Sequence, residues 1–250
     1  NVKMMYQKKK IHFIGIGGIG MSAIAEILHE KGFKISGSDI SNNSITKRLQ
    51  KRGIKIFFEH SWRNLGDSDV AVYTSAIKKN NEELKFAKSK KIPVLSRASI
   101  LAEVMRLKPS ITVAGSHGKT STTSLLASIL EFSNFDPTII NGGIINSIKA
   151  NAKLGKGDWI IAEADESDGS FKCLPSTIGI INNIDLEHID YYKNIREVKD
   201  AFLEYSKHIP FYGFLSLCID HKNVRELKKK LFDKKVITFG LNKKANFSAT

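Results

Sequence analysis

Residues 111–120 read Ile-Thr-Val-Ala-Gly-Ser-His-Gly-Lys-Thr, and this stretch decides the fold prediction. Its first four residues form an apolar, β-rich run, and a helical pattern follows over residues 120–133. A strand that enters a helix through a glycine-bounded loop is typical of an α/β nucleotide-binding domain, because the loop amides and the helix N-terminus cradle an anion. We therefore predict that the phosphates of a nucleoside triphosphate bind at Gly115, Ser116, His117, Gly118, Lys119, Thr120 and Ser121.

Two side chains of this loop have separate expected roles. Lys119 places a positive charge near the β- and γ-phosphates, and the Thr120 hydroxyl is placed to ligate Mg²⁺. Val113 stands where the common phosphate-loop pattern has its first glycine, so the loop has the shorter form Gly-x-x-Gly-Lys-Thr. Gly-Lys-Thr triplets also occur by chance in turns, but the strand before and the helix after favour a phosphate loop.

Short apolar runs alternate with helical patterns along the whole chain, which predicts parallel sheets covered by helices. We expect a Rossmann-like domain over residues 1–107 and a P-loop α/β domain with a mainly parallel sheet over residues 108–250, with Lys108-Pro109 as the hinge. The predicted strands are 11–15, 34–38, 55–57, 70–73, 94–95, 111–114, 159–162, 177–181, 214–219 and 236–239. The predicted helices are 20–31, 44–52, 82–90, 100–105, 120–133, 195–208 and 224–232. The chain stops at Thr250 without a closing element, so we expect the second domain to be incomplete.

Charge and composition exclude several classes of protein. The net charge is +14, but the lysines are scattered over predicted helices and turns, and no nucleic-acid-binding motif accompanies them. The longest stretch without a formal charge, residues 11–25, is too short to span a bilayer, which takes about 20 apolar residues. The two cysteines offer neither a disulfide framework nor metal-ligand spacing. We expect a cytoplasmic protein that binds no nucleic acid and does not insert into membranes.

A second glycine-rich loop follows the first predicted strand. Gly15, Gly17, Gly18 and Gly20 fit the pattern Gly-x-Gly-x-x-Gly, and Asp39 ends the next strand. Alone, this pattern suggests NAD or FAD with Asp39 on a ribose hydroxyl, but the geometry suits any nucleotide diphosphate. A glycine turn that only packs a helix on a strand stays an alternative.

Polar residues also follow other predicted strands, at the sheet edge where parallel sheets place their sites. Glu163 is the first acid to emerge from the strand at 159–162 and could complete a magnesium site with Thr120. His188 lies between acids after the strand at 177–181, where a role at a second metal or a phosphate competes with a merely exposed position. Asn141-Gly142-Gly143 is expected to form another loop at a strand end.

Taken in this order, the motifs resemble the Mur ligase family of peptidoglycan synthesis. The resemblance runs from Ile11 to Gly213 and includes segments 36–39, 75–77, 115–120, 141–143, 163–168 and 183–190. Ser116 and Ser121 stand where the family commonly has threonine, and Glu187 stands where aspartate usually precedes the histidine. None of these departures removes a proposed ligand.

The resemblance implies an ATP-dependent, Mg²⁺-dependent ligase that joins L-alanine to the carboxylate of UDP-N-acetylmuramate through an acyl phosphate. It implies that the catalytic residues are Lys119, Glu163 and His188, and that Thr120, Glu163 and His188 hold metal. The UDP-sugar would bind at Gly15, Gly17, Gly18, Gly20, Asp39, Ser75 and Asn141. The family has a third domain, which this chain lacks, so we expect residues 1–250 alone to turn over poorly or not at all.

Three alternatives stay open on the sequence. The first is a murein-recycling ligase that attaches a whole tripeptide to the same UDP-sugar. The second is a nicotinamide-dependent dehydrogenase, which rests on the glycine loop at residues 15–20 and Asp39 and does not explain the loop at 115–120. The third is a nucleotide-binding regulatory module without chemistry. Some relatives use a carbamylated lysine, and the sequence does not place one.

Overall fold

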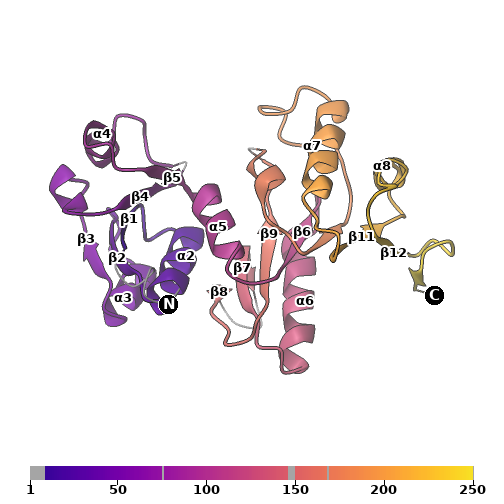
Figure 1. Cartoon of the computed structure of the whole chain (residues 1–250), viewed down its shortest axis with the longest axis horizontal. Helices are drawn as coiled ribbons and strands as arrows, with labels where there is room; N and C mark the ends of the chain where they lie inside the picture. Colours follow the sequence, from indigo (N-terminus) through magenta and orange to yellow (C-terminus); the bar gives the residue numbers. More distant parts are fainter. Residues whose placement is uncertain (1–8, 75, 146–149, 168, 250) are drawn as a thin grey trace. The chain divides into compact units, whose positions relative to one another are not determined.

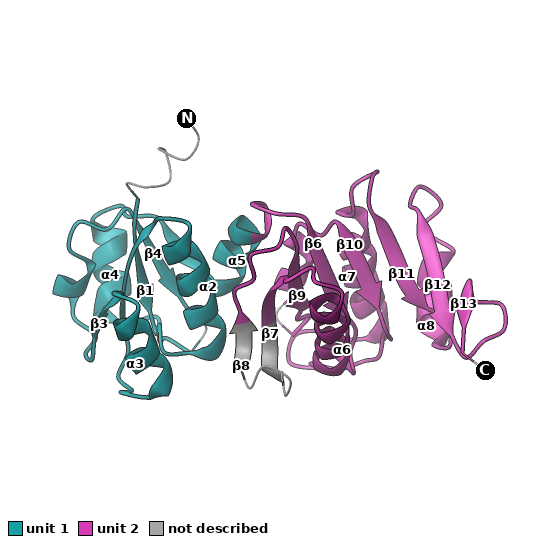
Figure 2. Ribbon diagram, turned by 90° about the horizontal axis from the view of Figure 1, so that it is seen from below, with its two compact units in different colours: residues 1–104 teal, residues 105–250 magenta. Residues whose placement is uncertain are grey.

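The computed structural model describes residues 9–74, 76–145, 150–167 and 169–249. The chain forms two compact units, residues 1–104 and 105–250, shown in separate colours in Figure 2. The predicted junction lies three residues later, after residue 107. Among the described residues, no helix combines the length and the apolar composition that a bilayer crossing requires.

Unit 1 is built on a five-stranded parallel sheet with the order β3-β2-β1-β4-β5. Its strands are β1 (Lys10–Ile14), β2 (Lys34–Ser38), β3 (Lys55–Phe57), β4 (Val70–Tyr73) and β5 (Val94–Ser96). Its helices are α2 (Ile19–Glu30), α3 (Ser44–Lys51), η1 (Trp62–Leu65), α4 (Glu82–Ser89) and α5 (Arg97–Met105). The strand order reverses direction between β1 and β4, and such a switch point is where doubly wound sheets bind nucleotides.

Local sequence signals explain the boundaries of these helices. Helix α3 begins with a capping box, in which the Asn43 side chain accepts from the Thr46 backbone and the Thr46 side chain accepts from the Asn43 N–H. Gly32 and Gly53 follow the ends of α2 and α3 with φ of 95° and 86°. The predicted helix ends at these two glycines are confirmed.

Unit 2 contains an eight-stranded sheet with the order β13-β12-β11-β10-β6-β9-β7-β8. Its strands are β6 (Ser110–Ala114), β7 (Thr138–Ile145), β8 (Ala150–Lys153), β9 (Ile160–Ala164), β10 (Ile178–Ile181), β11 (Phe214–Cys218), β12 (Val236–Gly240) and β13 (Phe247–Ser248). Its helices are α6 (Lys119–Phe132), η2 (Ser170–Cys173), α7 (Ile195–Lys207) and α8 (Lys222–Lys228). Figure 1 shows α6 lying along the sheet, where it packs on β6, β7 and β9. All described pairings except β7–β8 are parallel, so the predicted α/β class with mainly parallel sheets is confirmed.

The core of unit 2 fixes α7 to the central strand. Phe171 and Tyr205 stack with their ring centroids 5.4 Å apart, and the edge of Phe202 packs on Phe171 at 5.1 Å. The Tyr205 hydroxyl is hydrogen-bonded to Thr112 in β6. Burial raises the pKa of Tyr205 to about 12, against the smaller lowering effect of its hydrogen bonds. The contact between Tyr205 and Thr112 therefore fixes α7 against β6, the strand that leads into the loop at 115–118.

The prediction for residues 141–143 was wrong. They do not form a loop but continue strand β7 to Ile145, because β8 supplies an antiparallel partner. The pairing register shifts between Ile140 and Ile145, so the two glycines lie where the ladder is irregular. Asn141 therefore belongs to a strand.

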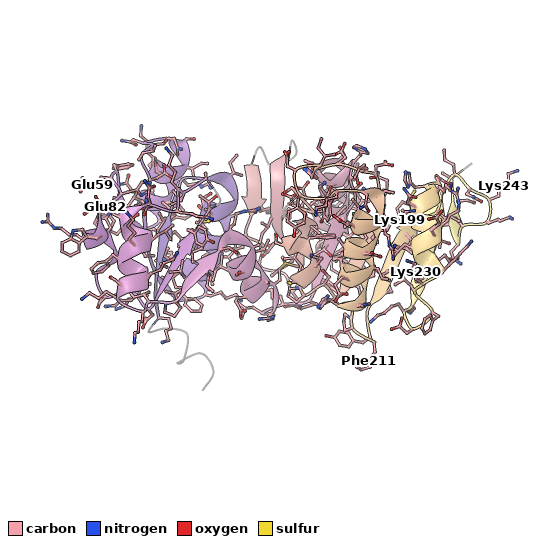
Figure 3. All side chains as sticks on the ribbon, turned by 90° about the horizontal axis from the view of Figure 1, so that it is seen from above. Glu59, Glu82, Lys199, Phe211, Lys230 and Lys243 are labelled. Atoms are coloured by element: carbon pink, nitrogen blue, oxygen red, sulfur yellow. The ribbon has the colours of Figure 1, made fainter. Side chains whose placement is uncertain are left out.

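Lysine side chains are spread over the surface of unit 2. Lys199, Lys230 and Lys243 project at separate places along the ribbon in Figure 3. Lys199 forms an ion pair with Glu226 at 2.6 Å, which offsets its charge. These three lysines are spread along unit 2 and do not form one cluster.

Candidate nucleotide-binding sites

The loop between β6 and α6 forms a helix N-terminus that is open to an anion. Gly118 caps α6 with φ 75° and ψ 9°, a left-handed conformation that side chains with a Cβ rarely adopt. No side chain at this position caps the first N–H groups of the 14-residue helix. These groups and the positive end of the helix dipole suit a phosphate.

The chain that follows β10 holds this loop in place. The Asn183 side chain accepts from the His117 N–H at 2.7 Å and donates to the His117 carbonyl at 3.1 Å. The Ser116 hydroxyl donates to the Asp185 carbonyl at 3.1 Å and accepts from the Asp185 N–H at 2.8 Å. Asn182 donates to the Thr122 hydroxyl one turn into α6. Because β10 pairs with β6, both segments leave the same edge of the sheet and can fix each other.

Lys119, Glu166 and His188 meet at the same edge. The Lys119 Nζ lies 2.9 Å from Oε2 of Glu166 and 3.1 Å from Oε1. The His188 Nε2 lies 3.6 Å from the same Oε1. Glu166 is only 1% exposed, whereas the side chain of His188 is 37% exposed. A buried carboxylate therefore connects the lysine of the phosphate loop with the histidine that follows β10.

His188 is held in a strained conformation. Its φ is 52°, in the left-handed region, and its carbonyl accepts hydrogen bonds from the N–H groups of Tyr191 and Tyr192. Such conformations persist where the surroundings impose them, and they cluster at functional sites. The Tyr192 hydroxyl reaches back to the Glu166 carbonyl at 2.9 Å, so one tyrosine binds both segments.

The predicted site residues divide into two groups in the structure. Lys119 and His188 are brought to one carboxylate, as described above. Thr120 lies in the first turn of α6, and Glu163 is a half-buried residue of β9 paired with Val113 of β6. Glu166 was not among the predicted site residues, because nothing in a run of four acids within six residues shows which one is buried.

The donor set at this edge fits Mg²⁺ carried by a nucleotide better than a metal held by the protein alone. Among the described residues, no three His, Cys, Asp or Glu side chains gather as a metal site. Magnesium is commonly held by one or two protein oxygens together with substrate phosphates. The Thr120 hydroxyl, in the first turn of α6, and the Glu163 carboxylate, near the end of β9, are oxygens of the kind that Mg²⁺ prefers. His188 is a poorer ligand for this metal, because Mg²⁺ prefers oxygen.

The glycine loop of unit 1 lies against Asp39. The Gly17 N–H donates to Oδ2 of Asp39 at 2.8 Å, and Oδ1 accepts from the Ser41 N–H at 2.9 Å. A Cβ on Gly17 would lie 2.8 Å from the same Oδ2 and 2.9 Å from Cγ2 of Thr46, so any larger residue would make these side chains shift. Gly15 and Ile16 both donate to the Ser38 carbonyl, which fixes the loop to the end of β2. Ser75 lies outside the described residues.

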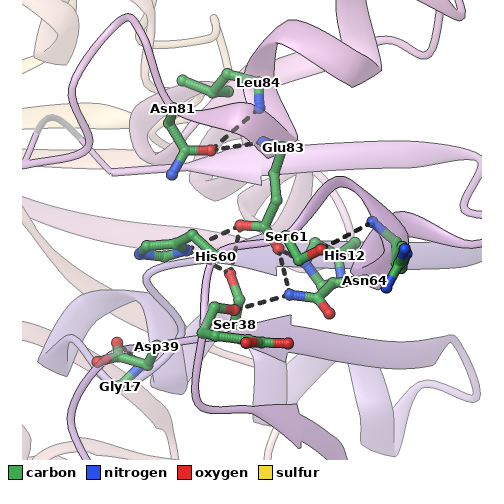
Figure 4. A network of polar contacts seen from close by, with 12 residues as sticks. His12, Gly17, Ser38, Asp39, His60, Ser61, Asn64, Asn81, Glu83 and Leu84 are labelled. Atoms are coloured by element: carbon green, nitrogen blue, oxygen red, sulfur yellow. Dashed lines mark hydrogen bonds and ion pairs between the residues drawn. The ribbon is translucent and has the colours of Figure 1, made fainter.

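A buried polar network supports the end of β2 that carries Asp39 (Figure 4). Glu83 is fully buried, and four side chains contact its carboxylate. The contacts are Ser38 Oγ at 2.6 Å, His60 Nδ1 at 2.9 Å, Asn64 Nδ2 at 2.9 Å and His12 Nε2 at 3.2 Å. Burial alone would raise the pKa of Glu83, but the hydrogen bonds of His12, Ser38 and Asn64 and the charge of His12 hold it below its usual value. The sequence does not reveal this network, because an acid in the first turn of a helix usually faces solvent.

Comparison with protein families identifies both units. The model of the Mur ligase family, catalytic domain, matches residues 10–109, and that of the Mur ligase middle domain matches residues 113–250. UDP-N-acetylmuramate–L-alanine ligase of Xanthobacter autotrophicus is 51% identical over 94% of this chain, and the one of Brucella ovis is 49% identical over 98%. The chain spans about half the length of these curated relatives, 50% and 52%.

Two solved ligase structures are also similar to this chain. UDP-N-acetylmuramate-alanine ligase of Thermotoga maritima is 33% identical with a TM-score of 0.78, over 94% of this chain and 53% of that one. UDP-N-acetylmuramate:L-alanyl-gamma-D-glutamyl-meso-diaminopimelate ligase of Neisseria meningitides is 25% identical with a TM-score of 0.82, over 92% of this chain and 78% of that one.

Proposed function

The chain belongs to the Mur ligase family, and from this premise we propose that it supplies two substrate sites of a ligase that joins L-alanine to UDP-N-acetylmuramate. Unit 1 would bind the UDP-sugar, and unit 2 would bind ATP with Mg²⁺. The observation that carries the proposal is the pair of phosphate-type loops, each at a strand end of its own sheet, in a chain 51% identical to a relative named for this reaction. We place the reaction in the cytoplasm, where both nucleotides are made.

Each loop contributes anion recognition. In unit 1, the Gly17 N–H donates to Oδ2 of Asp39, so the glycine loop and the acid lie side by side at the end of the sheet. The diphosphate of the UDP-sugar would bind along Gly15, Gly17, Gly18 and Gly20, with Asp39 available for a sugar hydroxyl. Ser75 and Asn141 stay predicted contacts of this substrate.

In unit 2, the N-terminus of α6 and Lys119 would bind the triphosphate. The N–H groups of Gly118 and Lys119 at the start of α6 would bind the phosphates, while Asn183 accepts from the Ser116 and His117 N–H groups and fixes the loop. Thr120 and Glu163 would hold the magnesium ion, with His188 near a second. When bound, the metal offsets the negative charge of phosphates and carboxylate as they approach.

The reaction requires a carboxylate to become an electrophile. The muramate carboxylate attacks the γ-phosphorus of ATP, ADP leaves, and an acyl phosphate forms. The amine of L-alanine then attacks the acyl carbon, and phosphate leaves with the C–O electron pair. The role of Lys119 is to stabilise charge on the transferring phosphoryl group, since its ammonium lies at the loop that binds the phosphates.

Binding to residues 1–250 tests the two sites. We expect UDP-N-acetylmuramate and MgATP to bind in the micromolar range that is typical of enzyme substrates, and NADH not to bind. Binding of NADH without binding of the UDP-sugar would contradict the ligase proposal and revive the dehydrogenase.

A second ligase activity is favoured by one observation, the TM-score of 0.82 to a ligase that acts on a tripeptide. The higher identity to the alanine ligases, 49–51% against 25%, makes L-alanine the first choice. Phosphate release by the whole protein separates the two: it should depend on L-alanine, and dependence on the tripeptide instead would reassign the substrate.

A further inference from the structure

The Lys119 ammonium is fully engaged with protein oxygens. Its Nζ donates to the carbonyls of Gly115 at 2.8 Å and Ser116 at 3.4 Å, and to Oε1 of Glu166 at 3.1 Å. An ammonium has three N–H donors, so these three acceptors use all of them. A triphosphate that binds Lys119 must therefore replace at least one of these contacts.

Glu166 is the only charged member of that set and the least well satisfied. Its Oε2 lies 2.9 Å from Nζ, yet it accepts no hydrogen bond of good geometry from any described residue. A buried, incompletely satisfied carboxylate beside a phosphate loop is unfavourable by itself, and it also repels an incoming polyanion. Such an arrangement costs both stability and affinity, and this cost indicates that the position has a functional role.

The main chain fixes Glu166 where it is. Its carbonyl accepts from the Tyr192 hydroxyl at 2.9 Å and from the Gly169 N–H at 2.9 Å. The N–H of Tyr192 donates to the His188 carbonyl, which places His188 beside the same carboxylate. The main chain of Glu166 is therefore fixed, and the carboxylate can follow Lys119 toward a phosphate only by turning about its own side-chain bonds.

We infer that Glu166 is a positioning residue that serves as the internal counter-ion of Lys119: it aligns the lysine and His188, and it competes with the nucleotide phosphates for the lysine. The inference rests on the proposed ATP site. The competition is strongest against metal-free ATP, which carries the most negative charge, and weaker against MgATP. This sign separates the counter-ion from a magnesium ligand, whose loss would weaken binding of MgATP.

Calorimetric titration of residues 1–250 with ATP in EDTA and with MgATP tests this inference. We expect Glu166→Gln to tighten metal-free ATP about tenfold and MgATP by a smaller factor, because one buried negative charge is removed beside the phosphates. Asp165→Asn is the matched control: it removes the same charge from an exposed neighbour, and both affinities should stay within about twofold.

Two results would overturn the inference: unchanged or weaker binding of metal-free ATP by Glu166→Gln, or a tenfold loss of MgATP affinity. If Glu166→Gln does not fold, Tyr192→Phe provides the test, because it keeps every charge and loosens the anchor of Glu166. Metal-free ATP should then bind about twofold to threefold more tightly, and an unchanged affinity would equally count against the counter-ion. Failure of the unaltered chain to bind either form would instead refute the proposed ATP site.

Discussion

Replacing Glu83 by glutamine tests the buried network of unit 1. The carboxylate accepts from Asn64 and contacts His12 through Oε1, and it contacts Ser38 and His60 through Oε2. Glutamine keeps the shape and one acceptor oxygen, but it turns the other oxygen into a donor that faces two of these partners. Hydrogen bonds to a charged group contribute about 1 kcal/mol more than neutral ones. Over four contacts, and with the relief of burying a charge subtracted, we expect unit 1 to lose about 2–4 kcal/mol.

The loss should depend on pH with a defined sign. The pKa of Glu83 is held below its ordinary value of 4.5, so the folded state favours the carboxylate. Its contribution is present above pH 4.5 and is lost as the pH falls through the lower, folded-state pKa. Glutamine cannot titrate, so the stability gap between the two proteins should narrow in acid.

Each unit contains one tryptophan, which allows the measurement to be made on unit 1 alone. In a Trp159→Phe background, fluorescence of Trp62, which packs on Phe86 at 5.3 Å, reports urea unfolding of unit 1. Glu82→Gln, on the exposed neighbour labelled in Figure 3, is the control and should change stability by less than about 0.5 kcal/mol. A gap below that value at pH 7, or one equally large at pH 3, would refute the reasoning.

Three further substitutions test the core and the two loops. Tyr205→Phe removes the hydroxyl bonded to Thr112 and should cost about 1–2 kcal/mol in urea unfolding followed by Trp159. Because the pKa of Tyr205 is raised from 10.0 to about 12, the unaltered protein should lose stability as the pH rises above 10, and persistence of that loss in the variant would contradict the assignment. Lys119→Ala should weaken MgATP at least about tenfold in a titration and leave UDP-N-acetylmuramate within twofold; a folded variant that loses both would disprove the division between units. Gly17→Ala should weaken UDP-N-acetylmuramate at least about tenfold and leave MgATP within twofold, since its Cβ would lie 2.8 Å from Asp39 Oδ2. An unchanged affinity for the UDP-sugar would show that this loop is not part of the site.

The parallel strands were predictable because each is a short apolar run that ends at a polar or glycine signal. Strands β2, β3 and β4 have the predicted boundaries, and the other predicted strands differ by only a few residues. The β7–β8 pair was not predictable in the same way. Asn141-Gly142-Gly143 has the composition of a turn, yet it lies inside β7, whose antiparallel partner β8 is the edge strand of the sheet.

The candidate site was predictable as far as residue type and strand end determine it. Lys119 follows from the loop pattern, and His188 from its place after β10. Glu166 and Glu83 do not follow, because burial of a carboxylate depends on tertiary contacts that local patterns do not encode. Each is recognisable only once Lys119 or His12 is seen beside it.

The central position of β6 has a consequence for how unit 2 forms during synthesis. Strand β6 is the first strand of this unit, yet it pairs with β9 and β10, and its Thr112 contacts Tyr205, 93 residues further along the chain. At about 5–20 residues per second, Tyr205 leaves the ribosome on the order of ten seconds after Thr112. Until β9 and β10 have been made, β6 is an apolar strand with two unpaired edges, so this part of the chain is where a chaperone would bind the nascent protein.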